Sequence, residues 1–228
     1  MMALPKVALF DVDGTLFDTE RLWAEALSLV FETLGNRQSP QRLMHLTYGM
    51  AWPDAYAALA TAIPETLAGF SAQRLGHQLC LQFDKLFQLA PPVIESSVAL
   101  LRRLHYAGVK CAYVSGSPRQ TITTNLARCG LTGLLDETCS VPSDDVRMGK
   151  PFPEGYLLAL KRCGVAPSEA VAFEDSKVGS TAALAAEIQT YVCPPPSAPE
   201  QSYPNGVIRV QSWAELFAGL PEVELQID

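Results

Sequence analysis

The sequence predicts an α/β fold: a parallel β-sheet with helices on both faces, and a small all-helical segment inserted after the first strand. Beyond residue 90, short apolar runs alternate with segments of helical periodicity, as in strand–helix–strand units. Between residues 19 and 88, apolar residues recur at helical spacing and no alternating strand pattern occurs. We therefore expect a core made of residues 1–18 and 89–228, and a helical cap made of residues 19–88.

The first predicted strand, Lys6–Phe10, leads into the helical cap. The first cap helix has one apolar stripe, formed by Leu22, Ala26, Leu29 and Val30. Later cap helices are separated by residues that start or stop helices, namely Gly35-Asn36, Ser39-Pro40, Pro53 and Pro64. The last cap helix is predicted at Leu75–Phe87, and Gln88–Glu95 is predicted to be a linker.

The remaining chain alternates between predicted helices and strands. The helices are Ser97–Ala107, Thr121–Cys129, Glu154–Cys163, Gly179–Ala186 and Ser212–Leu220. The strands are Val109–Val114, Glu137–Val141, Ala170–Phe173, Thr190–Cys193 and Val207–Val210, and the second of these has the weakest pattern. Three of the helices are followed by a glycine, as helix C-termini favour: Gly108, Gly130 and Gly164.

Two carboxylates follow the first strand, in Asp11-Val12-Asp13-Gly14-Thr15. If the strand geometry continues, Asp11 and Asp13 point the same way, because side chains repeat with a period of two. Like charges at the end of an apolar strand are costly unless a divalent cation, a phosphoryl group or both are bound there. An acidic Asp-Gly turn without a function is the alternative, and these residues by themselves leave both open.

Asp11, Ser115 and Asp175 each follow an apolar strand by one or two residues, although they are far apart in sequence. The carboxyl ends of parallel strands meet at one edge of the sheet, where such folds bind their ligands. This placement predicts a single site. The helical segment leaves and rejoins the core beside the same edge, so we expect it to cover the site.

Composition excludes several classes of protein. The 228 residues are 48% hydrophobic and 18% charged, which is typical of a compact globular chain. The formal net charge of −7 argues against a nucleic-acid partner, which requires a basic face. The N-terminal region has one short apolar run, which predicts neither a secretion signal nor a membrane span. We expect a cytoplasmic protein that is a monomer or a small homo-oligomer and does not bind membranes.

Four short motifs resemble those of the haloacid dehalogenase-like hydrolases, in the order of that family. They are Asp11-Val12-Asp13-Gly14-Thr15-Leu16, Tyr113-Val114-Ser115-Gly116-Ser117, Gly149-Lys150-Pro151-Phe152-Pro153-Glu154 and Phe173-Glu174-Asp175-Ser176. The resemblance covers roughly residues 5 to 190. It points to the branch that includes β-phosphoglucomutase-like and phosphoglycolate phosphatase-like proteins, which implies a Rossmann-like core with a small helical cap.

The resemblance also implies roles for these residues. Asp11 would be the nucleophile that forms an aspartyl-phosphate, and Asp13 the general acid and base. Lys150 would neutralise negative charge. Ser115 and the N–H of Gly116 would hold phosphate oxygens. In isolation, Ser115 could be a helix cap and Lys150 an ordinary loop lysine.

The same resemblance implies a magnesium ion. Its ligands would be the Asp11 carboxylate, the backbone carbonyl of Asp13, and Asp175 with Glu174 nearby. In isolation, the Glu174-Asp175 pair could instead be an exposed turn or a helix cap. One departure from the family pattern is Glu187, where relatives often have glycine, and we expect a changed helix end there.

Residues of the cap decide the substrate. Trp23 and Trp52 stand where β-phosphoglucomutases have a histidine and an arginine, and either tryptophan could line the site or belong to the cap core. We expect a magnesium-dependent phosphatase of a small phosphorylated metabolite, such as a sugar phosphate or phosphoglycolate. The alternatives are a phosphomutase and a non-catalytic binding protein on the same fold.

Overall fold

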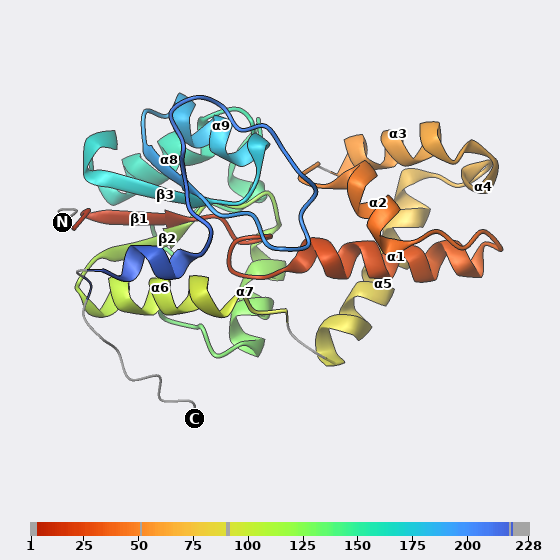
Figure 1. Cartoon of the computed structure of the whole chain (residues 1–228), viewed down its shortest axis with the longest axis horizontal. Coiled ribbons are helices and arrows are strands. Elements are labelled where there is room, and N and C mark those ends of the chain that lie inside the picture. The colour runs from red at the N-terminus through yellow and green to blue at the C-terminus, as the bar shows by residue number, and fades with distance from the viewer. Residues whose placement is uncertain (1–3, 51, 90–91, 219, 221–228) are drawn as a thin grey trace. The chain divides into compact units, whose positions relative to one another are not determined.

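The first apolar run forms an interior strand of a parallel sheet. The computed structural model describes residues 4–50, 52–89, 92–218 and 220. Its sheet has the order β2-β1-β3-β4-β5, with every pair parallel (Figure 1). The strands are β1 (Val7–Phe10), β2 (Lys110–Tyr113), β3 (Ala170–Glu174), β4 (Gln189–Val192) and β5 (Ile208–Arg209). The predicted fold class is confirmed.

Alternation along β1 builds a core on each face of this sheet. Ala8 and Phe10 of β1 belong to one cluster of buried residues, and Val7 and Leu9 belong to another. Helices α6 (Glu95–Tyr106) and α7 (Arg119–Arg128) supply the first cluster, whereas α8 (Glu154–Cys163) and α9 (Lys177–Ala185) supply the second. Figure 1 shows α6 on one side of the strands, and α8 and α9 on the other.

Two predicted elements are wrong. No strand forms at Glu137–Val141, where Val141 makes an isolated bridge to Val114. Instead, the Asp136 side chain accepts hydrogen bonds from both the N–H and the hydroxyl of Thr138, which turns the chain. The helix predicted at Ser212–Leu220 is a short 3₁₀ helix, Trp213–Phe217, followed by extended backbone at Ala218. Residue 219 lies outside the described residues, as do residues 90 and 91 of the predicted linker.

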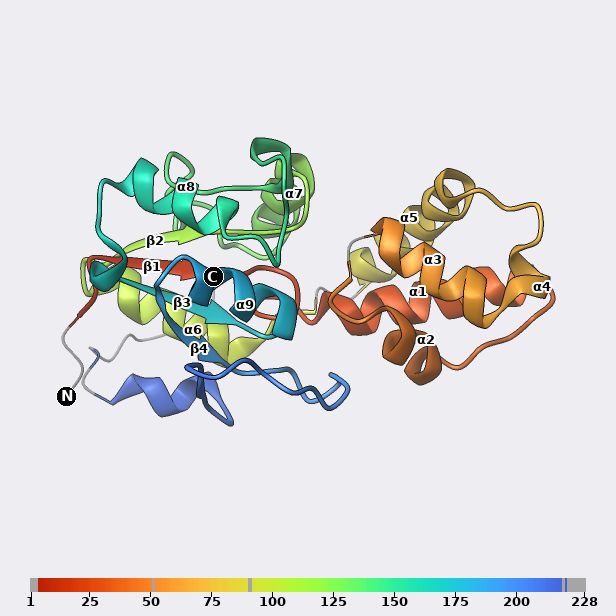
Figure 2. The ribbon, with the colours of Figure 1, turned by 90° about the horizontal axis from the view of Figure 1, so that it is seen from above.

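A second compact unit contains the helices of the inserted segment. It comprises Asp18–Pro92 together with Pro196–Gln201, and the sheet unit comprises the rest of the chain. Its helices are α1 (Thr19–Thr33), α2 (Pro40–Thr47), α3 (Trp52–Ala62), α4 (Pro64–Leu67) and α5 (Ala72–Leu89). Helix α1 packs against both α2 and α5 (Figure 2).

Residues 196–201 group with this helical unit although they follow the sheet strand β4. The hydroxyl of Ser197 donates a hydrogen bond to Asp18 at 2.8 Å. Ala198 packs against a small cluster of Ala24, Met44 and Tyr48. We call residues 196–201 the return segment. Because of it, the chain passes between the two units four times rather than twice.

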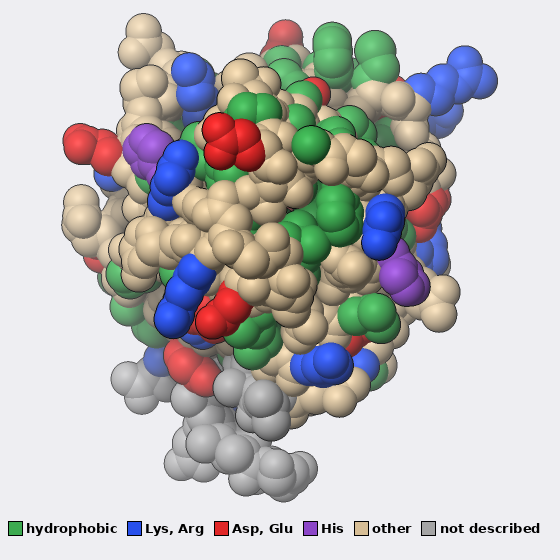
Figure 3. Space-filling model, turned by 90° about the vertical axis from the view of Figure 1, so that its right-hand side faces the viewer, with side chains coloured by type: hydrophobic (Ala, Val, Ile, Leu, Met, Phe, Trp, Pro, Cys, Tyr) green, Lys and Arg blue, Asp and Glu red, His purple; other side chains and the backbone are tan. Residues whose placement is uncertain are grey.

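Charged side chains of both signs share the face shown in Figure 3. There, lysine and arginine side chains are interspersed with aspartate and glutamate and with hydrophobic groups. Among the described residues, no helix combines the length and the apolar character needed to cross a lipid bilayer.

The sequence predicted a changed helix end at Glu187, and the structure of the end of α9 differs from this expectation. Glu187 adopts a left-handed backbone conformation, with φ of 62°, which glycine adopts most readily. Two hydrogen bonds close the helix: Glu187 N–H to the Leu184 carbonyl and Ile188 N–H to the Ala183 carbonyl. The helix end is therefore retained, and Glu187 carries the strain of a non-glycine residue in this region.

Replacing this glutamate by glycine should stabilise the protein. We expect Glu187→Gly to raise the free energy of unfolding by about 1 kcal/mol, because glycine adopts positive φ without the Cβ clash. Urea denaturation measures it. The control is Ala185→Gly, at an exposed position of α9, which should lower stability by about 1 kcal/mol. Equal losses in both variants would contradict a strained residue 187.

Candidate active site

Three buried carboxylates converge at the carboxyl edge of the sheet. Asp11 follows β1, Glu174 ends β3 and Asp175 follows it. Each offers one oxygen atom, and these atoms lie within 4.8 Å of one another. In the strand order, the chain proceeds from β1 to β2 on one side and to β3 on the other. The cluster therefore lies at the point where the strand order reverses, which is where open α/β sheets bind ligands.

Backbone geometry and two glycines make room for these carboxylates. The N–H of Asp11 donates to the carbonyl of Phe173 at 2.9 Å, which continues the β1–β3 ladder to the first acid. A Cβ atom at Gly14 would collide with the carboxylate of Asp175, and one at Gly179 would collide with that of Glu174. Any larger residue at these two positions would displace an acid from the cluster.

Lys150 binds two of the three acids. Its Nζ atom lies 2.5 Å from Oδ1 of Asp11 and 2.7 Å from Oε1 of Glu174, and its side chain is 15% exposed. Lys150 belongs to the third motif, Glu174 to the fourth and Asp11 to the first. Three motifs that are far apart in the sequence therefore meet at this ion pair. The structure thus brings together Asp11, Lys150, Glu174 and Asp175.

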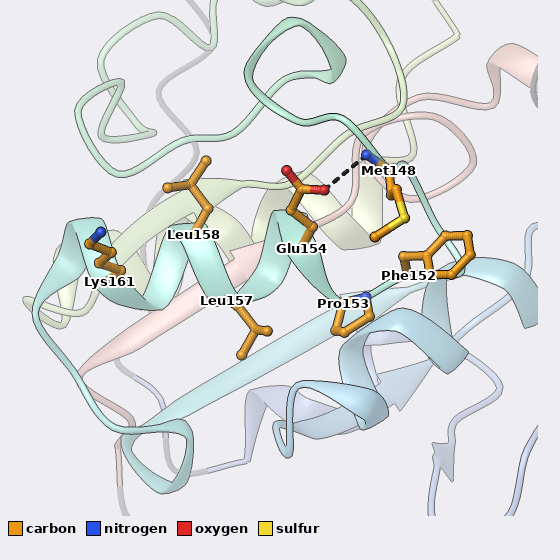
Figure 4. A pocket seen from close by; sticks show the side chains of 7 residues that line it. All are labelled: Met148, Phe152, Pro153, Glu154, Leu157, Leu158 and Lys161. Atoms are coloured by element: carbon orange, nitrogen blue, oxygen red, sulfur yellow. Dashed lines mark hydrogen bonds between the residues drawn. The ribbon is translucent and has the colours of Figure 1, made fainter.

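Helix α8 fixes the loop that carries this lysine. The Glu154 carboxylate, at the start of α8, accepts hydrogen bonds from the N–H groups of Arg147 at 3.0 Å and Met148 at 2.9 Å. The second bond is drawn in Figure 4, beside a groove of about 470 Å³ on the outer side of α8. The groove lining is mostly apolar, which suits a phosphate ester poorly, so we place the chemistry at the acid cluster.

Asp13 belongs to a different set of contacts from the other acids. Its Oδ2 atom accepts a hydrogen bond from the hydroxyl of Ser117 at 2.6 Å, and the hydroxyl of Ser115 lies 3.5 Å away. Ser115 Oγ in turn accepts the N–H of Ser117 at 3.0 Å. The side chain of Asp13 thus faces the second motif. Sequence reasoning missed Ser117, although its position two residues after Ser115 was a signal for it.

Tyr156 is a second residue that the sequence analysis missed. It lies on α8 with no exposed surface, and its hydroxyl donates to Oε1 of Glu174 at 2.6 Å. Burial, reinforced by the negative charges of Glu174 and Asp11, raises the pKa of Tyr156 well above its usual value. The hydroxyl therefore remains a donor over the whole range in which enzymes work.

The cluster has unusual electrostatics. Burial raises the pKa of Asp11 well above its usual value; Lys150 opposes this shift, whereas Glu174, Asp175 and Asp13 add to it. Burial alone would lower the pKa of Lys150, but Asp11 and Glu174 outweigh burial and raise that pKa, so the lysine stays charged. One ammonium group therefore faces several carboxylates.

The residues present fit a hard divalent cation. Oδ2 of Asp11 is buried and has no hydrogen-bond partner among the described residues, although a buried carboxylate oxygen normally has one. Asp11 belongs to a set of three acids whose possible metal ligands are all carboxylate oxygens. Magnesium prefers oxygen ligands. A cation bound there would satisfy the unpartnered oxygen and offset the excess negative charge.

The other predicted binding residues have less specific surroundings. Gly116 lies between the two serines, and open space surrounds the place where its Cβ would be. Trp23 stacks on Phe83, with ring centroids 3.9 Å apart. The indole N–H of Trp52 donates to the carbonyl of Ala72 at 3.1 Å. Both tryptophans are half-buried in the helical unit, and their contact with a substrate stays a prediction.

Comparison with known proteins gives consistent matches. A family model for haloacid dehalogenase-like hydrolases matches residues 5–187. The validoxylamine A 7′-phosphate phosphatase of Streptomyces hygroscopicus subsp. limoneus is 32% identical, over 80% of this chain and 83% of that protein. The phosphorylated carbohydrates phosphatase of Thermotoga maritima is 33% identical, over 81% and 82%.

A solved structure agrees with these relatives. The crystal structure of a hydrolase of the same family from Deinococcus radiodurans, with bound phosphate and sodium, has a TM-score of 0.76 and 27% identity. The match covers 95% of each chain.

The raised pKa of Asp11 predicts how stability depends on pH. Since this pKa is higher in the folded state than in the unfolded chain, metal-free protein should lose stability as pH rises from about 4 through the folded pKa. Asp11→Asn does not titrate, so in chelator it should become more stable than wild type with rising pH, by about 1 kcal/mol or more. Urea denaturation at pH 4 to 8 measures it.

Asp136→Asn is the control of opposite sign. Hydrogen bonds from Thr138 are the main cause that lowers the pKa of Asp136, so this variant should be less stable than wild type at pH 7 and equal to it at low pH. A difference between Asp11→Asn and wild type that does not change with pH would rule out a destabilising charge at Asp11.

Proposed function

The chain belongs to the haloacid dehalogenase-like hydrolases, and we propose that it is a magnesium-dependent phosphatase of a small phosphorylated sugar. The observation that carries this proposal is the cluster of Asp11, Glu174 and Asp175, in which Lys150 is ion-paired and Oδ2 of Asp11 has no partner among the described residues. The relative named as a phosphorylated carbohydrates phosphatase supports the substrate class.

In the proposed mechanism, Asp11 attacks the phosphorus atom and forms an aspartyl-phosphate. A phosphate monoester dianion repels an anionic nucleophile, so positive charge must lie beside the nucleophile. Lys150 supplies it at 2.5 Å from Oδ1 of Asp11 and stays protonated throughout. The Ser115 hydroxyl and the Gly116 N–H would hold other oxygens of the phosphate group.

Asp13 would give a proton to the leaving alcohol and then take one from water. Its carboxylate is placed by Ser117 and lies outside the three-acid cluster, so it can change protonation without losing the cluster's contacts. Asp11, Glu174, Asp175 and the backbone carbonyl of Asp13 would hold the magnesium ion, which, when bound, neutralises charge and permits two anions to approach.

The contacts of the arginine side chains in the helical unit favour a phosphatase over a phosphomutase. A mutase must hold a second phosphate, which needs free cationic groups. Here Arg21 pairs with Glu25 at 2.6 Å, and Arg74 lies over the ring of Phe70. Arg42 donates to Gln38 at 2.8 Å. These three arginines are engaged within the helical unit itself, whereas Lys85 of α5 is exposed.

A screen of phosphorylated metabolites tests the proposal. We expect inorganic phosphate to be released in step with substrate loss, most rapidly from a sugar phosphate, and a sugar bisphosphate should not stimulate the reaction. Excess chelator should abolish turnover, and calcium should restore it poorly because its coordination is looser. Full activity in chelator would exclude the metal. Isomerised sugar phosphate appearing faster than free phosphate would establish the mutase.

Substitution of Asp13 tests its role as the acid and base. Asp13→Asn should lower kcat by roughly 100-fold or more on an alkyl phosphate, whose leaving group needs a proton. The loss should be smaller on nitrophenyl phosphate, because that leaving group departs as an anion. Steady-state kinetics on both esters measures the difference, and equal losses would contradict general acid catalysis.

Location and assembly are part of the same proposal. A phosphorylated metabolite is a cytoplasmic substrate, so we propose that the protein acts in the cytoplasm. Its partner would be this small molecule rather than a nucleic acid or a membrane. Whether it acts as a monomer or as a small homo-oligomer stays a prediction.

A further inference from the structure

Tyr156 brings a hydroxyl group into the acid cluster, although it lies outside all four sequence motifs. Its ring is fully buried in the core cluster between α8 and the sheet. A phenylalanine would fill that space equally well, so apolar packing does not explain the hydroxyl. A hydroxyl buried in this way needs a partner, and its partner is Glu174.

The hydroxyl and the ammonium group of Lys150 share one acceptor atom. Tyr156 donates to Oε1 of Glu174 at 2.6 Å, and Lys150 donates to the same atom at 2.7 Å. The Lys150 Nζ atom also lies 5.6 Å from the centroid of the tyrosine ring. Two donors therefore hold one oxygen of this carboxylate. On the other oxygen, Oε2, the hydroxyl of Ser176 lies at 3.4 Å, a long distance for a hydrogen bond.

We propose that Tyr156 is a positioning residue that fixes the rotation of the Glu174 carboxylate. Held in this way, Oε1 keeps Lys150 against Asp11, and Oε2 remains the oxygen that a cation can use. The inference rests on the proposed function, because it gives Tyr156 a part in the metal site of that enzyme. Without the hydroxyl, a single donor would remain on Oε1, and the carboxylate could turn away from the cation.

Direct metal binding to the full chain, without substrate, tests the proposal. Manganese serves as the probe because its binding can be followed by electron paramagnetic resonance. We expect Tyr156→Phe to weaken manganese affinity roughly 10-fold, the usual loss when a group that orients a metal ligand is removed. The matched control is Tyr113→Phe, which removes a hydrogen bond of 3.0 Å from another buried tyrosine to Glu137. Tyr113→Phe should leave the affinity within about twofold of wild type, as expected away from the site.

A double-mutant cycle separates a positioning role from a structural one. If Tyr156 acts through Glu174, then Tyr156→Phe should have almost no further effect on manganese affinity in a Glu174→Gln background. The same 10-fold loss in both backgrounds would overturn the proposal. Wild-type affinity in the single variant Tyr156→Phe would also overturn it.

Two further measurements keep the test decisive. If Tyr156→Phe does not fold, as judged by circular dichroism, wild-type protein with ¹³C-labelled tyrosine replaces it. Magnesium should then shift the Cζ resonance of Tyr156 but not that of Tyr113, and no shift would overturn the proposal.

Phosphate release together with manganese binding that does not depend on Tyr156 would refute the positioning role alone. Tyr156-dependent binding without release from any ester would refute the proposed function alone.

Discussion

The ion pair between Lys150 and the buried acids is the interaction on which the rest of this site depends. Three carboxylates lie within 4.8 Å of one another around one ammonium group, so two negative charges remain uncompensated when all are ionised. Buried charges are retained at a cost in stability unless they are paired. Under the proposed function, a cation would offset the charge of the acids and a phosphoryl group would pair with the lysine.

The surrounding fold holds these like charges together. Parallel pairing of β1 with β3 places Asp11 beside Glu174, and the hydrogen bond from Asp11 N–H to Phe173 fixes the first acid on the sheet. Gly14 and Gly179 leave the volume that the carboxylates occupy. Helix α8 supplies Glu154, whose carboxylate holds the loop that carries Lys150. Repulsion within the cluster is thus resisted by backbone and helix packing as well as by the ion pairs of Lys150.

Strand ends and the family resemblance predicted Asp11, Asp175 and Lys150. Ser117 was missed, and so was Tyr156, which reaches the site from a helix. Period-two alternation and strand ends were sufficient to bring Asp11 and Asp175 to one edge. Tyr156 lies in the apolar stripe of its helix, so the sequence indicates a core residue, and the direction of its hydroxyl depends on the packing of α8 on the sheet. The strand expected at Glu137–Val141 failed because a local side-chain turn at Asp136 competed successfully with the ladder.

The proposed chemistry is confined to one of the two units of this chain. The proposed catalytic and metal-binding residues all belong to the sheet unit. In the helical unit, polar groups such as the indole of Trp52 and the guanidinium of Arg21 bond to partners within that unit. Substitutions of these residues should therefore leave the acid cluster unaltered. The return segment limits this independence, because Ser197 and Ala198 pack with the helices while their chain neighbours belong to the sheet unit.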